Sequence, residues 1–405
     1  MHSWLRIDVS DKHQKMKLSH LRVSGIIPVI MILLFAGFIE CKSPVAREEK
    51  QKKENINHID IKYARGFNID DFGEYKLVHV FNPWQSIEGK SITYLLYPRG
   101  SEQPHSVSFN FAVPVPVRRV ICMSTTHIAM IRALGETGSI AGVSGKQYIS
   151  DSIVRAGIDK GEIPDIGYEQ SVNYEMILEI NPEVIFMYGV TSDVTAIISR
   201  LESLGIPVVL NAEYLENHPL ARTEWIKFMS CFYDKLDAGM DFFNLQEESY
   251  LQLKKMMINI PDKPDVMAGL PWKNTWWVPG GRSFAAVLIE DAGGRYIWDE
   301  DTSDEALPLD IEAVYNKAGQ ADLWINSGSA SSMKELIDTD PRLRLFKPFR
   351  ESQIYNNTAR LNPSGGNDYW ESGVIYPQII LKDLIHIFHP EVLPAHTMVY
   401  YIKLE

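Results

Sequence analysis

Hydrophobic and polar positions along the chain predict one order of helices and strands that occurs twice. In the first copy, an apolar helix over 128–134 ends at Gly135, and a strand over 140–143 follows. A helix that begins at 173–175 then leads into the apolar strand 183–187. Each of these segments has the length and period of the element it predicts.

The second copy keeps the same order. A helix over 284–292 ends at Gly293, and a strand over 296–298 follows. A helix that begins at 310–312 leads into strand 322–326. Alternating strands and helices favour a mostly parallel sheet with helices on its faces. We therefore predict an α/β fold of two similar Rossmann-like lobes that face one another across a cleft, where ligands favour binding.

The remaining segments give the order of domains. Alternating runs over 77–81, 92–97 and 107–111 predict a small antiparallel β meander ahead of the first lobe. A continuous helical pattern between the lobes predicts one long connecting helix, which favours small rocking motions over large hinge closure. The predicted divisions are a signal peptide with a lipidation site (1–41), a flexible tether (42–60), a β-rich N-terminal extension (61–115), a first lobe (116–219), the connecting helix (220–258) and a second lobe (259–405).

The N-terminus has the features of an export signal. Basic residues precede an apolar run over 23–39, which is short for a membrane-spanning helix, and Cys41 follows it. We expect Cys41 to carry a lipid that anchors the protein to a membrane. Glu40 is unusual directly before a lipidated cysteine, so a plain signal or an uncleaved anchor remains the alternative. Met1 and Met16 both fit as the first residue.

Composition is that of a globular protein. The 405 residues are 45% hydrophobic and 23% charged, which suits two or three ordinary cores. The formal net charge of −12 leaves no basic footprint for nucleic acid. Cys122 and Cys231 lack metal-ligand spacing, and we expect them to be buried thiols.

Several motifs resemble one family when they are taken in order. Ser-Thr-Thr-His at 124–127 precedes a helix, Asn-Tyr-Glu at 173–175 precedes Asn-Pro-Glu-Val-Ile at 181–185, and Leu-Gly-Ile-Pro-Val-Val occupies 204–209. With the duplication, the long helix and the export signal, they resemble substrate-binding proteins of ABC importers for iron chelates and cobalamin, over roughly 117–390. The resemblance implies a periplasmic, monomeric receptor without catalytic activity or cofactor. It would capture a metal chelate (ferric siderophore, haem or cobalamin) and deliver it to an ABC permease in the inner membrane.

The same resemblance implies two docking residues. Family members present a glutamate at the start of one helix in each lobe, and the glutamates pair with permease arginines. Glu175 and Glu312 match these positions, each two places after a helix-capping residue, Asn173 or Asp310. A glutamate in a first helical turn is also stabilised by the helix dipole alone, and this local role is the alternative.

Candidate ligand contacts lie at strand exits and in the loops beside them. Tryptophans suit the flat face of a corrin, porphyrin or catecholate, tyrosine hydroxyls can donate to chelate oxygens, and Arg282 suits an anionic group. The alternative for the three tryptophans at 272–277 is that one or two of them cover the core of their own lobe, and we expect Trp298 and Trp324 to be core residues. The candidates are His127, Tyr168, Tyr188, Glu213, Tyr214, Trp272, Trp276, Trp277, Arg282 and Trp370.

Other functions fit less well. A bare metal ion would need histidines from both lobes, and no histidine lies between His218 and His386. Hydrolase elbows and phosphate-binding glycine loops are missing from the sequence, and Ser124 near His127 fits a helix cap better than a nucleophile with its base. An exported hydrolase or transferase with its active site in the cleft, and a tethered interaction module without ligand transport, remain the alternatives.

Overall fold

A computed structural model describes residues 56–85, 89–105, 107–168, 171–189 and 194–405. Residues 54–405 form one compact unit. The predicted signal peptide, Cys41 and most of the predicted tether lie outside the described residues. Within the described part of the chain, no helix combines the length and the apolar character needed to cross a membrane.

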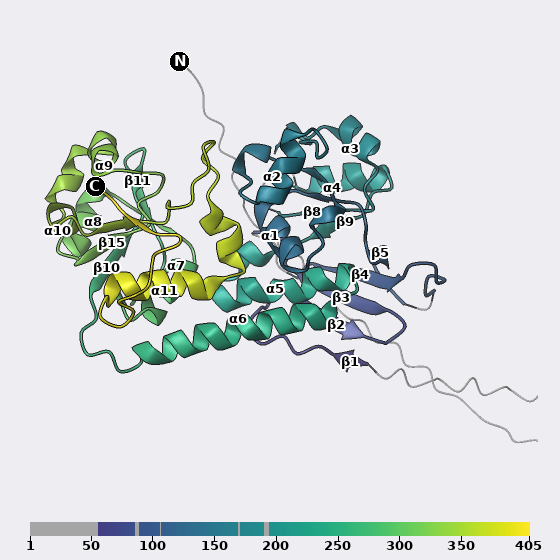
Figure 1. Cartoon of the computed structure of the whole chain (residues 1–405), viewed down its shortest axis with the longest axis horizontal. Helices are drawn as coiled ribbons and strands as arrows, with labels where there is room; N and C mark the ends of the chain where they lie inside the picture. The colour runs from purple at the N-terminus through teal and green to yellow at the C-terminus, as the bar shows by residue number, and fades with distance from the viewer. Residues whose placement is uncertain (1–55, 86–88, 106, 169–170, 190–193) are drawn as a thin grey trace, which may run out of the picture. The chain divides into compact units, whose positions relative to one another are not determined.

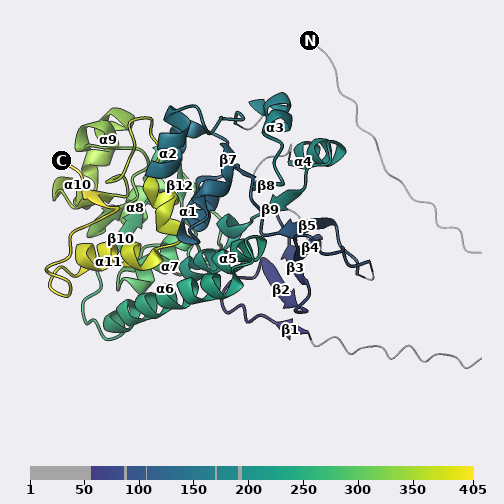
Figure 2. The same cartoon turned by 45° about the vertical axis from the view of Figure 1, so that its right-hand side comes forward.

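Figures 1 and 2 show the two lobes above the connecting helices. Both lobes contain a parallel sheet with the same strand order, so the duplicated fold predicted from the sequence is confirmed. In each lobe the first strand lies between the second and the third, and the fourth extends the sheet beyond the third. The first sheet has the order β7 (Ile140–Val143), β6 (Val120–Cys122), β8 (Val184–Met187), β9 (Val208–Leu210). The second has the order β13 (Arg295–Tyr296), β10 (Asp265–Ala268), β15 (Leu323–Ile325), β16 (Ile354–Asn356), with β17 (Ile402–Lys403) antiparallel at its edge.

Helices surround each sheet and keep the predicted order. Gly135 and Gly293 follow the first helix of their lobes with φ angles of 75° and 81°, a conformation that glycine adopts without strain. The first lobe contains α1 (Thr125–Ala133), α2 (Ser152–Asp159), α3 (Tyr174–Ile180) and α4 (Val194–Ser203). The second contains α7 (Phe284–Asp291), α8 (Ile311–Ala318), α9 (Met333–Thr339), α10 (Lys347–Arg350) and α11 (Pro377–Phe388).

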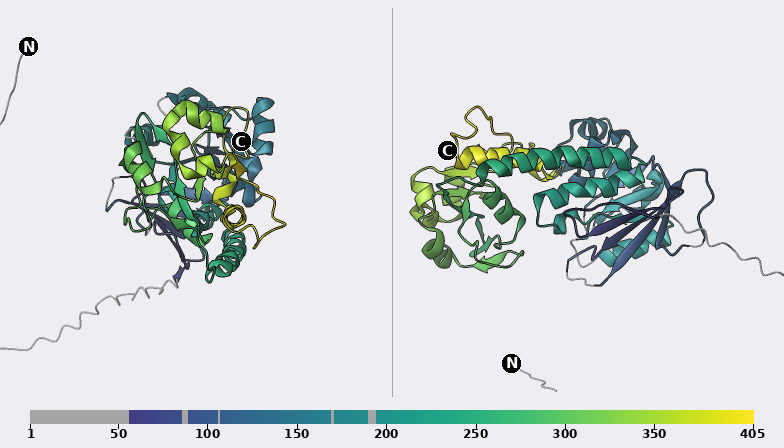
Figure 3. Two further views of the ribbon diagram at one scale, coloured as in Figure 1. Left: turned by 90° about the vertical axis from the view of Figure 1, so that its left-hand side faces the viewer. Right: turned by 90° about the horizontal axis from the view of Figure 1, so that it is seen from below.

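The connector is a pair of helices, so the prediction of one long connecting helix is wrong. Helix α5 (Pro219–Phe232) and helix α6 (Leu236–Met257) lie side by side, and α11 also packs against α6 (Figure 3). Asp234 turns the chain between α5 and α6 with a φ of 54°. A Cβ at Gly239 would lie 2.4 Å from Ser230 Oγ, so this glycine permits the close approach of the two helices. Helical periodicity continues on both sides of the turn, which is why the sequence pattern did not reveal it.

The N-terminal extension is a five-stranded sheet. Its strands are β1 (Asn57–His58), β2 (Phe67–Asp71), β3 (Lys76–Phe81), β4 (Ser91–Pro98) and β5 (Phe111–Val115). The first four pair antiparallel, but β5 pairs parallel with β4, so the wholly antiparallel prediction is wrong at this edge. The residues between β4 and β5 are numerous enough to bring the chain back in the same direction. The sheet packs on the connector, because Tyr94 contacts the rings of Phe228 and Phe232 on α5.

A small antiparallel sheet in the second lobe was not predicted. The tryptophan-rich segment forms the hairpin of β11 (Pro271–Trp272) and β12 (Thr275–Val278), and β14 (Leu307–Leu309) extends it. Lys273 and Asn274 form the two-residue turn with φ angles of 48° and 67°. Alternation along β12 buries Trp276 and exposes Trp277.

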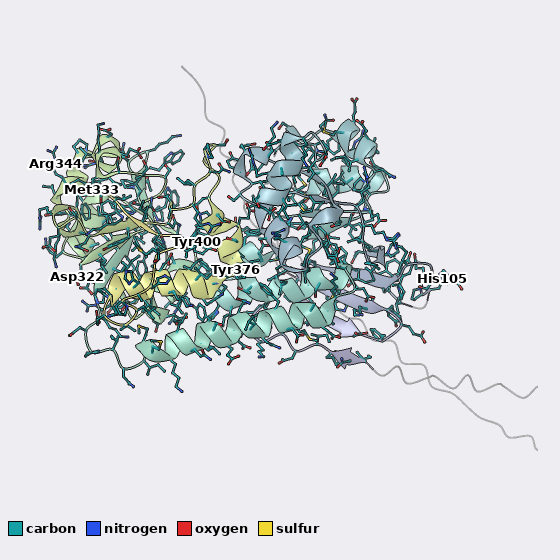
Figure 4. All side chains as sticks on the ribbon, viewed as in Figure 1. His105, Asp322, Met333, Arg344, Tyr376 and Tyr400 are labelled. Carbon is teal, nitrogen blue, oxygen red and sulfur yellow. The ribbon has the colours of Figure 1, made fainter. Side chains whose placement is uncertain are left out.

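The cores contain the thiols and the two strand tryptophans predicted to lie there. Cys122, Cys231, Trp298 and Trp324 are all buried. Tyr376 marks the N-terminal end of α11, which faces the first lobe (Figure 4). The segment that precedes α11 is therefore in a position to contact both lobes.

Candidate functional site

A cavity of about 240 Å³ lies where three strands of the first lobe end. The chain leaves β6, β8 and β9 at this edge of the sheet, and ligands of open α/β folds bind outside the carboxyl ends of the strands. The second lobe supplies Trp370 and Val374 to the same cavity. The lining residues from the first lobe and the connector are Ser124, Thr125, Thr126, Tyr188, Glu213, Tyr214 and Arg222.

Glu213 places a buried carboxyl group in this cavity. It begins a short 3-10 helix (Glu213–Leu215) directly after β9, and the Thr126 hydroxyl donates a hydrogen bond to its Oε1. Its Oε2 is buried and has no hydrogen-bond partner among the described residues. Burial raises the pKa of Glu213 to about 7, although the hydrogen bond from Thr126 and the charge of Arg222 oppose the shift. The group can therefore hold or release a proton near neutral pH.

Arg222 fixes a positive charge beside that carboxyl group. Its Nε donates to the Glu216 carbonyl oxygen at 2.8 Å and its Nη2 to the Tyr214 carbonyl oxygen at 3.1 Å. The guanidinium also lies 4.1 Å from the centre of the Phe284 ring of the second lobe. Burial lowers the pKa of Arg222, but arginine keeps its charge. The guanidinium is thus held in one orientation at the floor of the cavity.

Tyrosines form the adjoining wall. The Tyr214 hydroxyl donates to the Gly189 carbonyl oxygen at 2.6 Å, and the Tyr188 hydroxyl donates to the Tyr168 hydroxyl at 3.2 Å. The rings of Tyr188 and Tyr214 meet edge to face with centroids 6.3 Å apart. Tyr148 contacts Tyr168 at 5.6 Å. These phenols present both ring faces and hydroxyl groups, which suits an aromatic ligand that carries oxygen atoms.

The structure therefore brings together four of the residues predicted to contact ligand: Tyr188, Glu213, Tyr214 and Trp370. Tyr168 touches this group through the Tyr188 hydroxyl. Arg282 lies elsewhere in the inter-lobe region, in a larger cavity of about 960 Å³.

His127 and Trp276 belong to the core, which corrects their prediction as ligand contacts. His127 lies inside α1 and is fully buried, with its ring edge-on to Phe186 at 6.2 Å. Burial lowers the pKa of His127 to about 3, so the imidazole is neutral. Trp276 is also fully buried, and its Nε1 donates to the Ala268 carbonyl oxygen at 3.2 Å. The period of helix α1 directs the His127 side chain inward, and the period of strand β12 does the same for Trp276. The sequence places both residues after a predicted strand, and this position did not reveal the direction of their side chains.

Trp272 and Trp277 lie on the surface of the small sheet. Their exposed fractions are 63% and 50%, and neither lines the 240 Å³ cavity or the 960 Å³ cavity. Lys273 lies over the Trp272 ring at 4.1 Å. The hairpin therefore turns these two rings away from the inter-lobe site.

The second lobe reaches across to the first through a contact that the sequence did not suggest. The Glu371 carboxylate accepts hydrogen bonds from the backbone N–H groups of Ser150 and Asp151, both at 2.7 Å. Asn362 Nδ2 donates to the carbonyl oxygens of Gln147 and Ile149 at 2.9 and 3.0 Å. These bonds join the segment before α11 to the loop before α2, and they close one side of the inter-lobe region.

Sequence reasoning missed Arg222 and Glu371 for different reasons. Arg222 lies near the start of α5, three residues after Pro219. A proline favours the first position of a helix, so Pro219 was a signal in the sequence that a helix begins near the cleft. Glu371 follows an irregular stretch with no periodic pattern, so nothing local indicated a contact with residues 150–151.

Glu175 and Glu312 both lie in the first turn of a capped helix. Asn173 accepts from Met176 N and Asp310 accepts from Ala313 N, as predicted for the two caps. Both glutamates are exposed. Glu312 pairs with Arg342 at 2.5 Å, whereas no ion pair of Glu175 is found among the described residues.

In the part of the chain that the structure describes, no group of three or more histidine, cysteine, aspartate or glutamate side chains is close enough to hold a metal ion.

Comparisons with known proteins agree with this arrangement. The profile of the family described as periplasmic binding protein matches residues 120–361. An uncharacterised lipoprotein of Methanocaldococcus jannaschii is 27% identical over 409 aligned positions, which cover 94% of this chain and 95% of that protein. A crystal structure of a Pseudomonas aeruginosa periplasmic haem-binding protein superposes with a TM-score of 0.50 at 16% identity, covering 68% of this chain and 93% of that one. A structure from a Saccharomonospora viridis ABC-type Fe³⁺-hydroxamate transport system gives a TM-score of 0.50 at 17% identity, over 67% and 92% of the two chains.

Proposed function

This chain belongs to the periplasmic binding protein family, and from that premise we propose that it captures a metal chelate between its lobes and delivers it to an ABC permease. Members of the family are substrate-binding proteins without enzymatic activity, so the hydrolase and transferase alternatives are set aside. The proposed ligand is a ferric siderophore, haem or cobalamin.

One observation carries the proposal. The cavity at the strand ends of the first lobe combines tyrosines, a carboxyl group of raised pKa, a fixed guanidinium and Trp370 from the facing lobe. Aromatic rings give contact area to a flat ligand, and hydroxyl and guanidinium donors pair with its oxygen atoms. The haem and Fe³⁺-hydroxamate names of the two structural relatives support the same ligand class.

A thermal-shift panel tests this proposal. Ferric hydroxamate, ferric catecholate, haem and cobalamin would each be added to the purified protein. A true ligand at 100 times its Kd stabilises the folded state by about 2.7 kcal/mol, which is a readily measured rise in melting temperature. No shift with any of the four would contradict the proposed ligand class.

We further propose that Glu175 and Glu312 contact arginines of the permease. Both are exposed, and each is the second residue of its helix at the matching place in the duplicated lobe. Charge complementarity at such a surface favours correct docking. The Arg342 guanidinium that pairs with Glu312 would have to give up this ion pair or share it on docking.

Charge reversal separates docking from ligand binding. Glu175→Arg with Glu312→Arg should abolish ligand-stimulated transport in reconstituted vesicles while the Kd for the ligand stays unchanged. Glu179→Arg, on the same helix as Glu175 but one turn later, is the matched control and should transport normally. Loss of ligand affinity in the double variant would place these residues in the binding site and refute docking.

The proposed location is the outer face of a membrane, with a lipid on Cys41 as the anchor. The support comes from the apolar run before Cys41 and from two Methanocaldococcus jannaschii relatives that are named as lipoproteins. Cys41→Ser should release the protein into the soluble fraction after cell breakage. Retention of that variant in the membrane fraction would count against lipidation. We also propose that the protein acts as a monomer.

A further inference from the structure

The cavity that contains Arg282, of about 960 Å³, has a wall built from the N-terminal extension. Residues 61–66 and the end of β3 form that wall. The loop and helix start after β9 form the second wall, and the second lobe contributes Arg282, Thr302 and Asp304. The volume is at the upper end of the range of small-molecule sites. The family match begins at residue 120, so the extension wall is an addition to the family fold.

Buried carboxylates hold residues 61–66 in place. Glu224 is fully buried on α5 and accepts hydrogen bonds from three successive backbone N–H groups, those of Lys62, Tyr63 and Ala64, at 2.8, 2.7 and 2.9 Å. The Lys227 ammonium balances its charge at 2.7 Å. Charge-assisted bonds of this length are the strong ones, so this segment is a fixed part of the binding body.

A second carboxylate continues the attachment. Glu216 Oε1 accepts from the backbone N–H groups of Arg65 and Gly66, both at 2.9 Å, and from Trp225 Nε1 at 3.1 Å. A Cβ at Gly66 would lie 2.6 Å from the Trp225 ring, so the backbone here packs directly on α5. Glu216 lines the cavity, but its Oε1 is fully engaged with these three donors.

Two guanidinium groups in this cavity are available. The side chains of Arg65, from the extension, and Arg282, from the second lobe, are exposed and line the cavity. Neither guanidinium makes a hydrogen bond or an ion pair with another described residue. Lys62 in the same cavity pairs with Glu247 at 2.6 Å, and Asp304 accepts from Asn217 at 2.8 Å. Two unpaired arginines in one cavity suit carboxylate or phosphate groups, which the planar guanidinium binds with two parallel hydrogen bonds.

We propose that this cavity binds the anionic groups of the captured chelate, with Arg65 and Arg282 as the two contacts. The inference rests on the proposed function and narrows its ligand to a chelate with free carboxylate, catecholate or phosphate oxygens. The extension then contributes to ligand specificity, because it supplies Arg65, one of the two contacts. The hydrogen bonds of Glu216 and Glu224 to residues 62–66 hold the Arg65 backbone in place.

Matched ligands and matched variants test the proposal. Isothermal titration would compare haem, which carries two propionates, with its dimethyl ester, and ferric tris-catecholate with neutral ferric tris-hydroxamate. Arg65→Gln and Arg282→Gln are the test variants. Arg118→Gln removes an exposed arginine outside the cavity and is the control. A further titration uses citrate and inorganic pyrophosphate without metal, because anion binding by the two arginines does not require a chelate.

We expect the parent protein to prefer the anionic member of a pair. Each test variant should weaken binding of that member about tenfold, equivalent to about 1.4 kcal/mol, and leave the neutral member unchanged. The control should behave like the parent. Equal affinity of parent and test variants for an anionic chelate would overturn the inference while the proposed function stands. If no chelate binds but citrate or pyrophosphate binds and loses affinity in both variants, the anion site stands and the proposed function fails. If nothing binds, both fail.

Discussion

Removal of the Glu371 carboxylate is the sharpest test of how the two lobes are joined. It is buried and accepts two backbone hydrogen bonds at 2.7 Å from Ser150 and Asp151, at the N-terminal end of α2. The variant Glu371→Gln keeps the shape but has one acceptor oxygen instead of two, so one N–H group in the contact loses its partner. A hydrogen bond to a charged group contributes about 1.5–3 kcal/mol. Burial raises the pKa of Glu371 to about 8, so the carboxyl is mostly protonated at pH 7, and we expect a loss near the lower end of this range, about 1–2 kcal/mol.

Two measurements check this expectation. Urea unfolding gives the loss of stability, and hydrogen exchange of a peptide spanning 147–155 reports the two amides directly. Exchange in that peptide should become faster in Glu371→Gln. Glu300→Gln changes an exposed glutamate of the second lobe and should alter neither readout. Unfolding within about 0.3 kcal/mol of the parent, together with unchanged exchange in the peptide, would refute the assigned role of Glu371 in joining the lobes.

Three further changes probe the cavity, the extension and the connector. The raised pKa of Glu213 means that its protonated form favours folding below its ordinary value of 4.5, and this contribution is lost as pH rises through about 7. The stability of Glu213→Gln relative to the parent should therefore rise by on the order of 2 kcal/mol between pH 5 and pH 8, as measured by thermal unfolding. A stability difference between the two proteins that does not change with pH would contradict the burial of Glu213. Glu224→Ala leaves Lys227 buried without its carboxylate partner and removes the acceptor of the backbone N–H groups of residues 62–64, so we expect a loss of about 3–5 kcal/mol and new tryptic cleavage after Lys62; resistance to trypsin would contradict the attachment. Gly239→Ala should cost about 1–3 kcal/mol in urea unfolding, because its Cβ would meet Ser230; a neutral result would mean that α5 and α6 separate easily.

The duplicated fold was predictable because its signals are local. Each strand of the parallel sheets is a short apolar run, and each repeated helix is bounded by a cap or a glycine, so order and type follow from neighbouring residues. Asn173 and Asp310 cap their helices as predicted. The turn at Asp234 was not predictable, because helical periodicity is the same on both sides of it. The parallel pairing of β5 depends on a long connection that carries no local signal.

The site was predictable in part, for a physical reason. Tyr188, Glu213 and Tyr214 follow strands whose ends meet at one edge, so their gathering follows from parallel topology. His127 lies in the first turn of α1, beyond the end of β6, and there the helix directs its side chain into the core. Arg65 lies far from the cleft in sequence, and tertiary contacts such as those of Glu216 and Glu224 bring it there. Long-range contacts of this kind leave no pattern in a single sequence.

Titration of the purified protein with ferric hydroxamate, ferric catecholate, haem and cobalamin shows whether a metal chelate binds between the lobes. Trp370 is 47% exposed and reaches the cavity from the second lobe, so Trp370→Ala is the diagnostic variant, with the exposed Trp272→Ala as the control. We expect at least one chelate to bind with a stoichiometry of one, and we expect Trp370→Ala to weaken its binding about tenfold while Trp272→Ala does not. Failure of all four chelates to bind, or equal affinity of the parent and the Trp370→Ala variant, would contradict the binding of a chelate between the lobes.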